Sequence, residues 1–541
     1  MHLRRETRGR RPPLLLLGAA AVAVVVTAIP LAYLIVRTFE AGGQAVFDAL
    51  WRERTLDTTV TSVTLVIGVI IGSSILAVPT AWLLARTNVP GRAFFMVTAA
   101  LPLAVPSYVM AYAWIAEFPW MSGLWAAVLV MSLATYPYVA IPLTAALRTI
   151  DAGQEEAARS LGLGPIATAR RVTLPLTWPA AAAGLLLTAL YTLSEFGTVA
   201  IFRVDAFTRV IYTAYRASFD RTTAAVLALL LVLLALILVI VEARTRGRAN
   251  RWRIGSGVTR PAPRLQLSPR GRLLGVGWLT GVGVLALGVP GFSLLMRLLE
   301  SRRTGVDVTE LTGAIAGSIT SAGLGAAIAI VLALPIAVLA ARYATKLVRG
   351  IEGAAFLGHA LPGVVVGLSL VFFTLAVLPA VYQTVATLAF AYAVLFLPKA
   401  IGASRSAIDA VPPSLESTAR SLGRGPISSW LATTGRLSWP GVAAGALLVL
   451  LTAMKELPAT LMLRPTGFNT LATELWSRTE IEAFGAAAPY ALALIALAAV
   501  PAWLMGRWLA REPRVPGQSP DEAAEQDVLR TDQVAYVGGN R

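Results

Sequence analysis

The chain has 541 residues, of which 56% are hydrophobic and only 14% charged, and its mean hydropathy is +0.70. Because a soluble globular protein carries about 25% charged residues, this composition excludes an ordinary soluble enzyme. The chain has no cysteine, which excludes disulfides, thiolate metal sites and cysteine nucleophiles, and its formal net charge is +17.

Apolar segments of about 20 residues, long enough to cross a hydrocarbon core of about 30 Å, recur along the whole chain. We expect twelve such helices, at residues 14–36, 60–84, 94–115, 123–146, 180–202, 222–241, 273–295, 313–340, 354–378, 382–402, 440–463 and 484–508. The first has no charge for 23 positions, longer than the apolar core of a signal peptide (about 7–15 residues), so we expect it to be retained. The sequence therefore predicts an all-α polytopic membrane protein.

The basic residues gather on alternate connections between these segments. Residues 242–272 hold nine arginines against one acid, and the loops at 155–171, 342–352 and 399–436 are also basic. By the positive-inside rule these connections and both termini face the cytoplasm. This placement accounts for the positive charge better than nucleic-acid binding, because no basic and aromatic surface is predicted outside the membrane.

One stretch of sequence occurs twice without a gap, 261 residues apart, at 155–179 and 416–440. An internal repeat of this kind indicates two related halves. Each half holds six spans, an even number, so the halves share one orientation and form a parallel repeat about an axis along the membrane normal. The predicted parts are an N-terminal segment with the first helix and external loop (1–54), a first transmembrane domain (55–243), an Arg-rich cytoplasmic linker (244–272), a seventh helix with an external loop (273–309), a second transmembrane domain (310–510) and a disordered cytoplasmic tail (511–541).

The repeated loop is predicted to contain a short helix, because Glu, Ala and Arg are good helix formers. In the first copy Gly162 ends this helix, and the small side chains of Ala157 and Ala158 suit a face that seats in a partner's groove. Two such loops on one side would dock two partner subunits. The alternative is a helix that lies on the lipid headgroups.

The chain has no Walker-type ATP site of its own, because glycine precedes none of its three lysines. The energy for any transport must therefore come from another subunit or from an ion gradient.

The first copy, with Glu156-Ala157-Ala158 followed after three residues by Gly162, resembles the EAA motif of ATP-binding-cassette importer permeases. In the second copy Ser417-Thr418-Ala419 replaces Glu-Ala-Ala, and Glu416 lies one position earlier. In that family the loop forms a coupling helix that sits in a cleft of the ATPase. The resemblance implies the coupling residues Glu155, Glu156, Ala157, Ala158, Gly162, Glu416, Ala419 and Gly423.

The resemblance also implies the type I importer permease fold, two copies of an ATPase subunit, an extracytoplasmic solute-binding protein and transport by alternating access. ATP and magnesium would bind to the ATPase, and no cofactor to this chain. Residues 194–215, 454–476 and 101–115 resemble the two-domain ferric iron permeases, and the thiamine permeases remain an alternative. An ion-coupled secondary transporter is a further alternative, which predicts buried ionisable residues near the membrane midplane and transport without an ATPase.

Glu195 and Glu456 are related by the same 261-residue spacing and are predicted at membrane depth. A carboxylate there is costly unless it faces a polar cavity or a partner. We expect both to line the substrate pathway, and direct ligation of iron is a further possibility to which Tyr108, Tyr112 and Tyr191 would contribute. The alternative is a structural role, in which each glutamate pairs with Lys455 or an arginine, or bonds to the backbone at a helix break.

Overall fold

The computed structural model describes residues 12–509 apart from residues 41, 217–219, 250–263, 306, 344, 357 and 359–360. The basic N-terminal segment before residue 12, the middle of the predicted linker and the predicted C-terminal tail lie outside the described residues.

Within the described part of the chain, nine helices are long and apolar enough to cross a membrane, or ten if one bent pair is a single span. The nine are Leu14–Glu40 (α1), Glu53–Arg86 (α3), Gly123–Arg148 (α6), Ile166–Ser194 (which ends in α9, Leu174–Ser194), Arg221–Val241 (in α12, Arg221–Ala249), Pro269–Ser301 (α13, Pro269–Gly283, with α14, Val289–Thr304), Val308–Arg342 (α15), Val385–Asp409 (α18) and Pro426–Ala453 (which ends in α21, Arg436–Ala453). The bent pair and two shorter apolar helices, Gly363–Val377 (α17) and the apolar part of Phe484–Leu509 (α24), occupy the remaining predicted positions. The polytopic all-α fold is thus confirmed.

Shorter helices connect or cap these spans. They are α2 (Gly43–Leu50), α7 (Ala152–Ser160), α8 (Pro165–Thr168), α10 (Gly197–Ile201), α11 (Phe207–Arg216), α16 (Lys346–Phe356), α19 (Ser414–Ser421), α20 (Pro426–Trp430), α22 (Pro458–Leu463) and α23 (Leu471–Glu480).

Two predicted spans, 94–115 and 354–378, are interrupted in the structure, because a proline directly precedes the helix that forms their second part. The predicted span 94–115 is broken into α4 (Arg92–Ala100, continued to Ala104) and α5 (Ser107–Glu117), which meet at an angle of 95°. Pro106 has an extended backbone immediately before α5, and Pro362 likewise precedes α17. The predicted spans at 180–202 and 440–463 also end earlier, at Ser194 and Ala453. Each is followed by a short break and a second short helix, α10 in the first half and α22 in the second.

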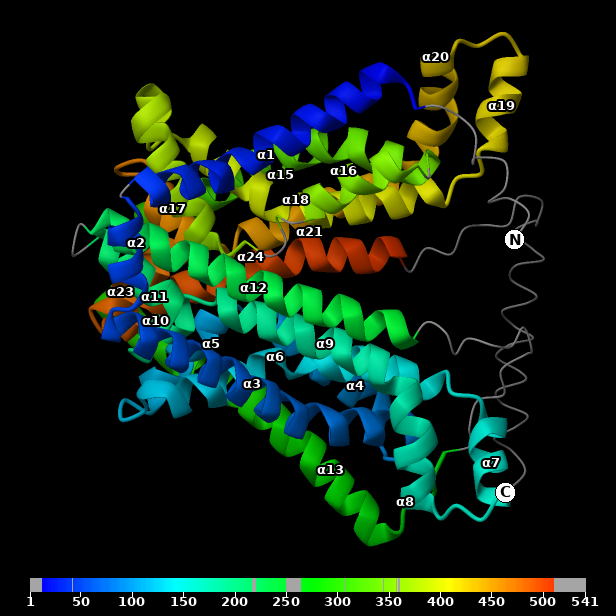
Figure 1. The fold of residues 1–541 in the computed structure, drawn as a ribbon. Coiled ribbons are helices and arrows are strands. Elements are labelled where there is room, and N and C mark those ends of the chain that lie inside the picture. The colour runs from blue at the N-terminus through cyan, green and yellow to red at the C-terminus, as the bar shows by residue number, and fades with distance from the viewer. Residues whose placement is uncertain are drawn as a thin grey trace.

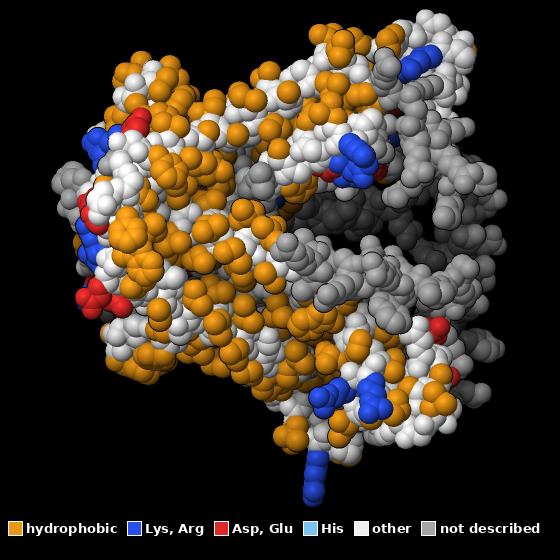
Figure 2. All heavy atoms as spheres, viewed as in Figure 1, with side chains coloured by type: hydrophobic (Ala, Val, Ile, Leu, Met, Phe, Trp, Pro, Cys, Tyr) orange, Lys and Arg blue, Asp and Glu red, His pale blue; other side chains and the backbone are white. Residues whose placement is uncertain are grey.

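Figure 1 shows two lobes, one built around α3, α6 and α9 and the other around α15, α18 and α21. Helices α7 and α19 lie at the same end of the molecule and on different lobes, whereas α10, α11 and α23 lie at the opposite end (Figure 1). Figure 2 shows a hollow between the lobes at the end that carries α7 and α19. Hydrophobic side chains cover the flanks of the helices in this view, and charged side chains gather near the two ends, as expected for a protein surrounded by lipid.

The first helix of each half packs against the other half. Ala20 and Ala23 of α1 lie in one buried cluster with Ala329 and Ala333 of α15. In the reverse direction, Trp278 of α13 donates its indole N–H to the hydroxyl of Thr80 in α3 at 3.2 Å. The predicted segments 1–54 and 273–309 therefore join the lobes together.

Small residues let the helices within a lobe approach closely. A methyl group added at Gly72 of α3 would lie 2.2 Å from the Ser132 hydroxyl of α6. A methyl group at Gly184 of α9 would lie 2.4 Å from the backbone oxygen of Tyr138. These contacts fix α3, α6 and α9 as one rigid unit that carries the loop containing α7.

Candidate functional site

The repeated loop folds into the same structure in both halves. Asp151 caps α7 by accepting a hydrogen bond from the backbone N–H of Gly153 at 3.1 Å. Two residues after the end of α7 lies Gly162, where φ is +85°, and two residues after the end of α19 lies Gly423 with the same φ of +85°. This backbone conformation is open to glycine and disfavours other residues, so the two glycines define the turn that follows each helix. After the turn, a five-residue π-helical segment leads into the membrane in each half, at Ala169–Thr173 and Leu431–Gly435.

The first glutamate of the loop is buried and holds α7 against the transmembrane helices. Only 7% of Glu155 is exposed, and its carboxylate accepts hydrogen bonds from the Arg86 guanidinium at the end of α3 and from the Thr173 hydroxyl (2.8 Å). Glu155 therefore ties the short helix to α3 and to the π-helical segment before α9.

The second half makes the same set of contacts through Glu416. Its carboxylate accepts a hydrogen bond from the Thr434 hydroxyl at 2.5 Å and lies 3.3 Å from the guanidinium of Arg342, at the end of α15. Thr173 and Thr434 are 261 residues apart, as are the two glutamates, whereas Arg86 and Arg342 are 256 residues apart. The second loop thus keeps the internal contacts of the first, although it lacks the Glu-Ala-Ala sequence.

Arg86 and Arg342 were not among the predicted loop residues because the gap-free repeat does not align them. A signal was present in the sequence, since each arginine follows directly on the second apolar run of its half.

The remaining predicted loop residues divide between an inner and an outer face. Ala158 and Ala419 are buried, with 6% and 8% of their surface exposed, and face inward together with the glutamates. Glu156 and Ala157 are exposed on the outer face of α7.

Large apolar side chains are exposed at matched positions of the two loops. Leu161 and Ile166 are each 84% exposed, and their counterparts Leu422 and Ile427 are 79% and 76% exposed. Leu161 and Leu422 directly follow α7 and α19, and Ile166 and Ile427 belong to α8 and α20, and Figure 1 shows these four helices at the same end of the molecule. Exposed apolar groups of this kind in a short, rigid loop are typical of a protein interaction site.

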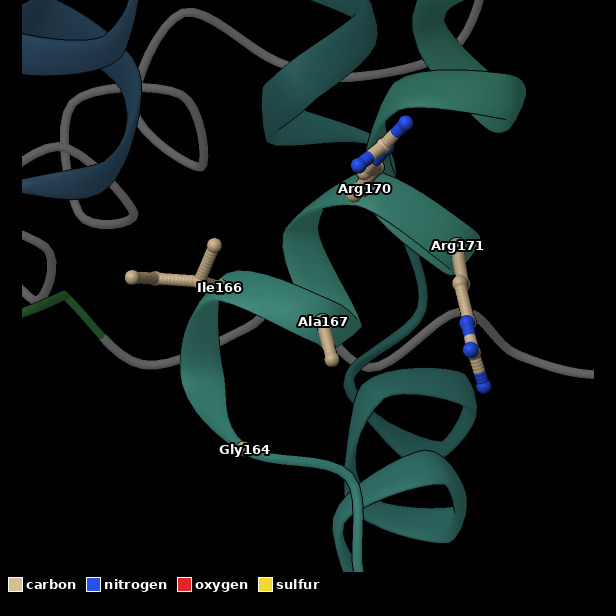
Figure 3. A pocket seen from close by; sticks show the side chains of 5 residues that line it. All are labelled: Gly164, Ile166, Ala167, Arg170 and Arg171. Carbon is tan, nitrogen blue, oxygen red and sulfur yellow. The ribbon is translucent and has the colours of Figure 1, made fainter.

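The first loop also borders an open hollow of about 820 Å³, lined by Gly164, Ile166, Ala167, Arg170 and Arg171. Figure 3 shows Ile166 pointing away from the helix that follows it, and Arg170 and Arg171 pointing in different directions from the next turn. The loop therefore presents apolar and cationic groups together.

Glu195 lies at the break after α9 and caps the short helix α10. It is 8% exposed, its backbone is extended, and its carboxylate accepts hydrogen bonds from the Ser107 hydroxyl (2.7 Å) and from the backbone N–H of Thr198 (2.9 Å). The hydroxyl of Tyr191 donates in turn to Ser107 at 2.7 Å.

Glu456 occupies the matching break in the second half and caps α22. It is 9% exposed and accepts hydrogen bonds from the backbone N–H groups of Ala459 and Thr460, both at 3.0 Å, and from the Thr460 hydroxyl at 2.9 Å. Where the first half has Ser107 at the start of α5, the second has Gly363 at the start of α17, and a methyl group there would lie 2.3 Å from the Glu456 carboxylate. Both glutamates thus bond to the backbone at a helix break, and their role in a substrate pathway stays a prediction.

The two halves meet in a layer of contacts near these breaks. Lys455 donates its ammonium to the backbone oxygen of Ala104 at 2.6 Å, and the Tyr108 hydroxyl donates to the backbone oxygen of Lys455 at 3.3 Å. Nearer the end opposite the loops, the rings of Phe196 and Trp476 lie 5.2 Å apart between centroids. A cavity of about 580 Å³ at this end is lined by both halves. The lobes are therefore joined here, and separated by the hollow at the loop end (Figure 2).

Among the residues that the structure describes, no cluster of three or more His, Cys, Asp or Glu side chains is placed to hold a metal ion. Tyr108 and Tyr191 lie near the glutamates, and Tyr112 donates its hydroxyl to the backbone oxygen of Phe484 at 2.5 Å.

Comparison with known proteins supports the resemblance drawn from the repeated loop. The family described as "Binding-protein-dependent transport system inner membrane component" matches the chain twice, at residues 73–246 and 333–512, more than half of its length. The "Fe(3+)-transport system permease protein FbpB 2" of Haemophilus influenzae is 34% identical over 501 residues, which cover 92% of this chain and 99% of the relative.

Two relatives match shorter stretches. The "Molybdenum transport system permease protein ModB" of Escherichia coli is 31% identical over 172 residues, 28% of this chain and 75% of the relative. The "Sulfate transport system permease protein CysW" of Synechocystis is 31% identical over 189 residues, 30% of this chain and 68% of the relative. The chain belongs to the family of binding-protein-dependent transport system inner membrane components, the permeases of ATP-binding-cassette importers, and carries the family domain twice.

Proposed function

We propose that this permease carries ferric iron across the bacterial cell membrane, with both termini and the loops of α7 and α19 in the cytoplasm. The observation that carries the proposal is the 34% identity with an Fe(3+)-transport permease over 92% of this chain. A single fused chain with two related halves is common to both proteins, since the match covers 99% of the relative.

Two copies of an ATPase subunit would bind to the permease, one at each loop. The matched exposed pairs Leu161 with Ile166 and Leu422 with Ile427 would enter a groove on each ATPase. The buried Glu155 and the half-buried Glu416 would pass its movement to α3 and α15. ATP and magnesium would bind to the ATPase, and the permease would carry out no bond chemistry.

Alternating access then follows from the arrangement of the lobes. The hollow between the lobes opens at the loop end, and the contact layer around Lys455 closes the other end. When the ATPase subunits close on ATP, the loops would draw together, the hollow would narrow and the contact layer would open to a solute-binding protein outside. Glu195 and Glu456 would border the pathway at this layer.

The test is uptake of labelled ferric iron and of labelled thiamine, in cells with and without this chain that also contain the matching ATPase and binding protein. The proposal predicts that iron uptake is lost without the chain and that thiamine uptake is unchanged. Loss of thiamine uptake instead would keep the importer mechanism and exclude iron as the cargo.

A further inference from the structure

Two of the three lysines of the chain lie inside the helix bundle. Lys399 is in the middle of α18 and Lys455 follows directly on α21. Both side chains are half-buried, whereas Lys346 is exposed at the start of α16. A basic residue at membrane depth is costly, so by default it marks a functional site.

The two lysines share one neighbour and lack a carboxylate partner. The Lys399 ammonium donates to the hydroxyl of Thr452 at 3.3 Å, and the backbone N–H of Lys455 donates to the Thr452 carbonyl at 3.2 Å. Within the described part of the chain, neither lysine forms an ion pair with an Asp or Glu side chain within 4.0 Å.

Glu456, although next to Lys455 in sequence, does not neutralise it. Its carboxylate is directed to the backbone of Ala459 and Thr460. Glu195 is similarly engaged by Ser107 and the backbone of Thr198. Thus both carboxylates cap helices. Each ammonium uses one of its three N–H donors on a neutral oxygen, that of Thr452 for Lys399 and that of Ala104 for Lys455, and has two more for a ligand.

The first half supplies hydroxyl groups at the positions that match the lysine site. Tyr138 and Tyr191 lie 261 residues before Lys399 and Thr452, and their rings are 5.8 Å apart between centroids. Tyr191 bonds to Ser107, and the adjacent Tyr108 reaches Lys455 across the interface. The two sides are linked through the backbone of Lys455, which accepts from the Tyr108 hydroxyl and donates to the Thr452 carbonyl, and the Thr452 hydroxyl in turn accepts from Lys399.

This set, Tyr138, Tyr191, Lys399, Thr452 and Lys455, is named the lysine layer. The ammonium groups can donate hydrogen bonds to anionic oxygen, whereas the hydroxyl protons of Tyr191 and Thr452 are engaged by Ser107 and by the backbone oxygen of Leu448. Two ammonium groups without a counter-charge repel a bare trivalent cation. We propose that the lysine layer binds anionic oxygen ligands of the cargo, so that ferric iron passes as a complex of net negative charge, with carboxylate or phosphate ligands. This inference rests on the proposed iron transport and specifies the form in which the iron crosses.

The test is uptake of ferric citrate labelled in both the metal and the citrate, by proteoliposomes that contain the permease, its ATPase and its binding protein. We expect iron and citrate to enter together in a fixed ratio. Lys399→Met and Lys455→Met should each raise the KM by about tenfold or more, the effect of losing a hydrogen bond to a charged group. Lys399→Arg should retain most of the uptake, and Lys346→Met is the matched control that should change nothing.

A second measurement needs no variant and so is independent of folding. In the wild-type complex, ferric citrate should protect Lys399 and Lys455 from an amine-reactive reagent and leave the reaction of Lys346 unchanged. If ferric citrate protected neither Lys399 nor Lys455, the proposal would be overturned.

The outcomes separate the two proposals. Iron that enters without any labelled anion, at a rate that both Met variants leave unchanged, would overturn the lysine layer and keep the iron permease. Lysine-dependent import of free citrate or phosphate without iron would keep the anion site and exclude iron as the cargo.

Discussion

Removal of Arg86 should release the short helix α7 from the transmembrane helices. The side chains of Arg86 and Glu155 are 8% and 9% exposed, so Arg86→Met leaves a buried carboxylate without its counter-charge. Loss of one partner from a buried ion pair costs about 3–5 kcal/mol. We expect the lower value, about 3 kcal/mol, because Thr173 still donates to the same carboxylate.

The free energy of local opening can be followed by hydrogen exchange of the backbone amides in α7. Because about 1.4 kcal/mol corresponds to a factor of ten, Arg86→Met should accelerate exchange in residues Ala152–Ser160 by about 100-fold. The double variant Arg86→Met with Glu155→Gln should recover most of the protection, since the glutamine carbonyl can still accept from Thr173. Arg159→Met, an exposed change on the same helix, is the control and should leave exchange unchanged.

The second half provides an internal comparison of the same contact. Arg342 and Glu416 are 10% and 13% exposed in their side chains, so solvent screens their interaction more. Arg342→Met should therefore accelerate exchange in α19 by a smaller factor, about 30-fold, for a cost of about 2 kcal/mol. Equal exchange in wild type and Arg86→Met, or additive effects of the two changes in the double variant, would refute the role of this ion pair in holding α7.

Two further changes test the loops and the breaks. Gly162→Val and Gly423→Val should each cost about 1–2 kcal/mol or more, because both positions have φ of +85°, and both should uncouple ATP hydrolysis from uptake to a similar degree in proteoliposomes. Gly164→Ala, where an added methyl group meets nothing within 4 Å, is the control, and normal coupling in both valine variants would show that the turn is dispensable. Glu195→Gln combined with Glu456→Gln should reduce iron uptake and leave assembly with the ATPase intact, because each amide oxygen can still cap its helix. Unchanged uptake in that double variant would leave both glutamates with a capping role alone.

The sequence was sufficient to predict the spans and the paired loops because hydropathy and a gap-free repeat report directly on them. Each apolar run in the chain became a helix, and prolines such as Pro106 and Pro362 changed where two of them begin. The loops could be identified because the region from Glu155 to Gly162 repeats with a constant spacing.

Contacts between helices could not be predicted in the same way. Hydropathy does not tell which neighbour an apolar helix has, so the packing of α1 and α13 on the opposite halves was not expected. The pairing of Arg86 with Glu155 was missed because an insertion changes the spacing of α3 and α15 relative to the loops. The capping by Glu195 and Glu456 was among the alternatives that the sequence left open.

The two halves are alike where they form the loops and unlike where they face each other. Glu155 and Glu416 make equivalent contacts despite divergent neighbouring sequence, as expected if both loops bind the same kind of ATPase under the proposed function.

In the lysine layer, by contrast, Tyr138 and Lys399 occupy matching positions and have different chemistry. A homodimeric permease would present two identical residues there, and two lysines or two tyrosines could not offer an ammonium on one side and a hydroxyl on the other. Fusion of the halves removes this constraint. The cargo passes between the halves and need not have twofold symmetry, so the fused chain can keep symmetric loops for its partners and an asymmetric surface for its substrate.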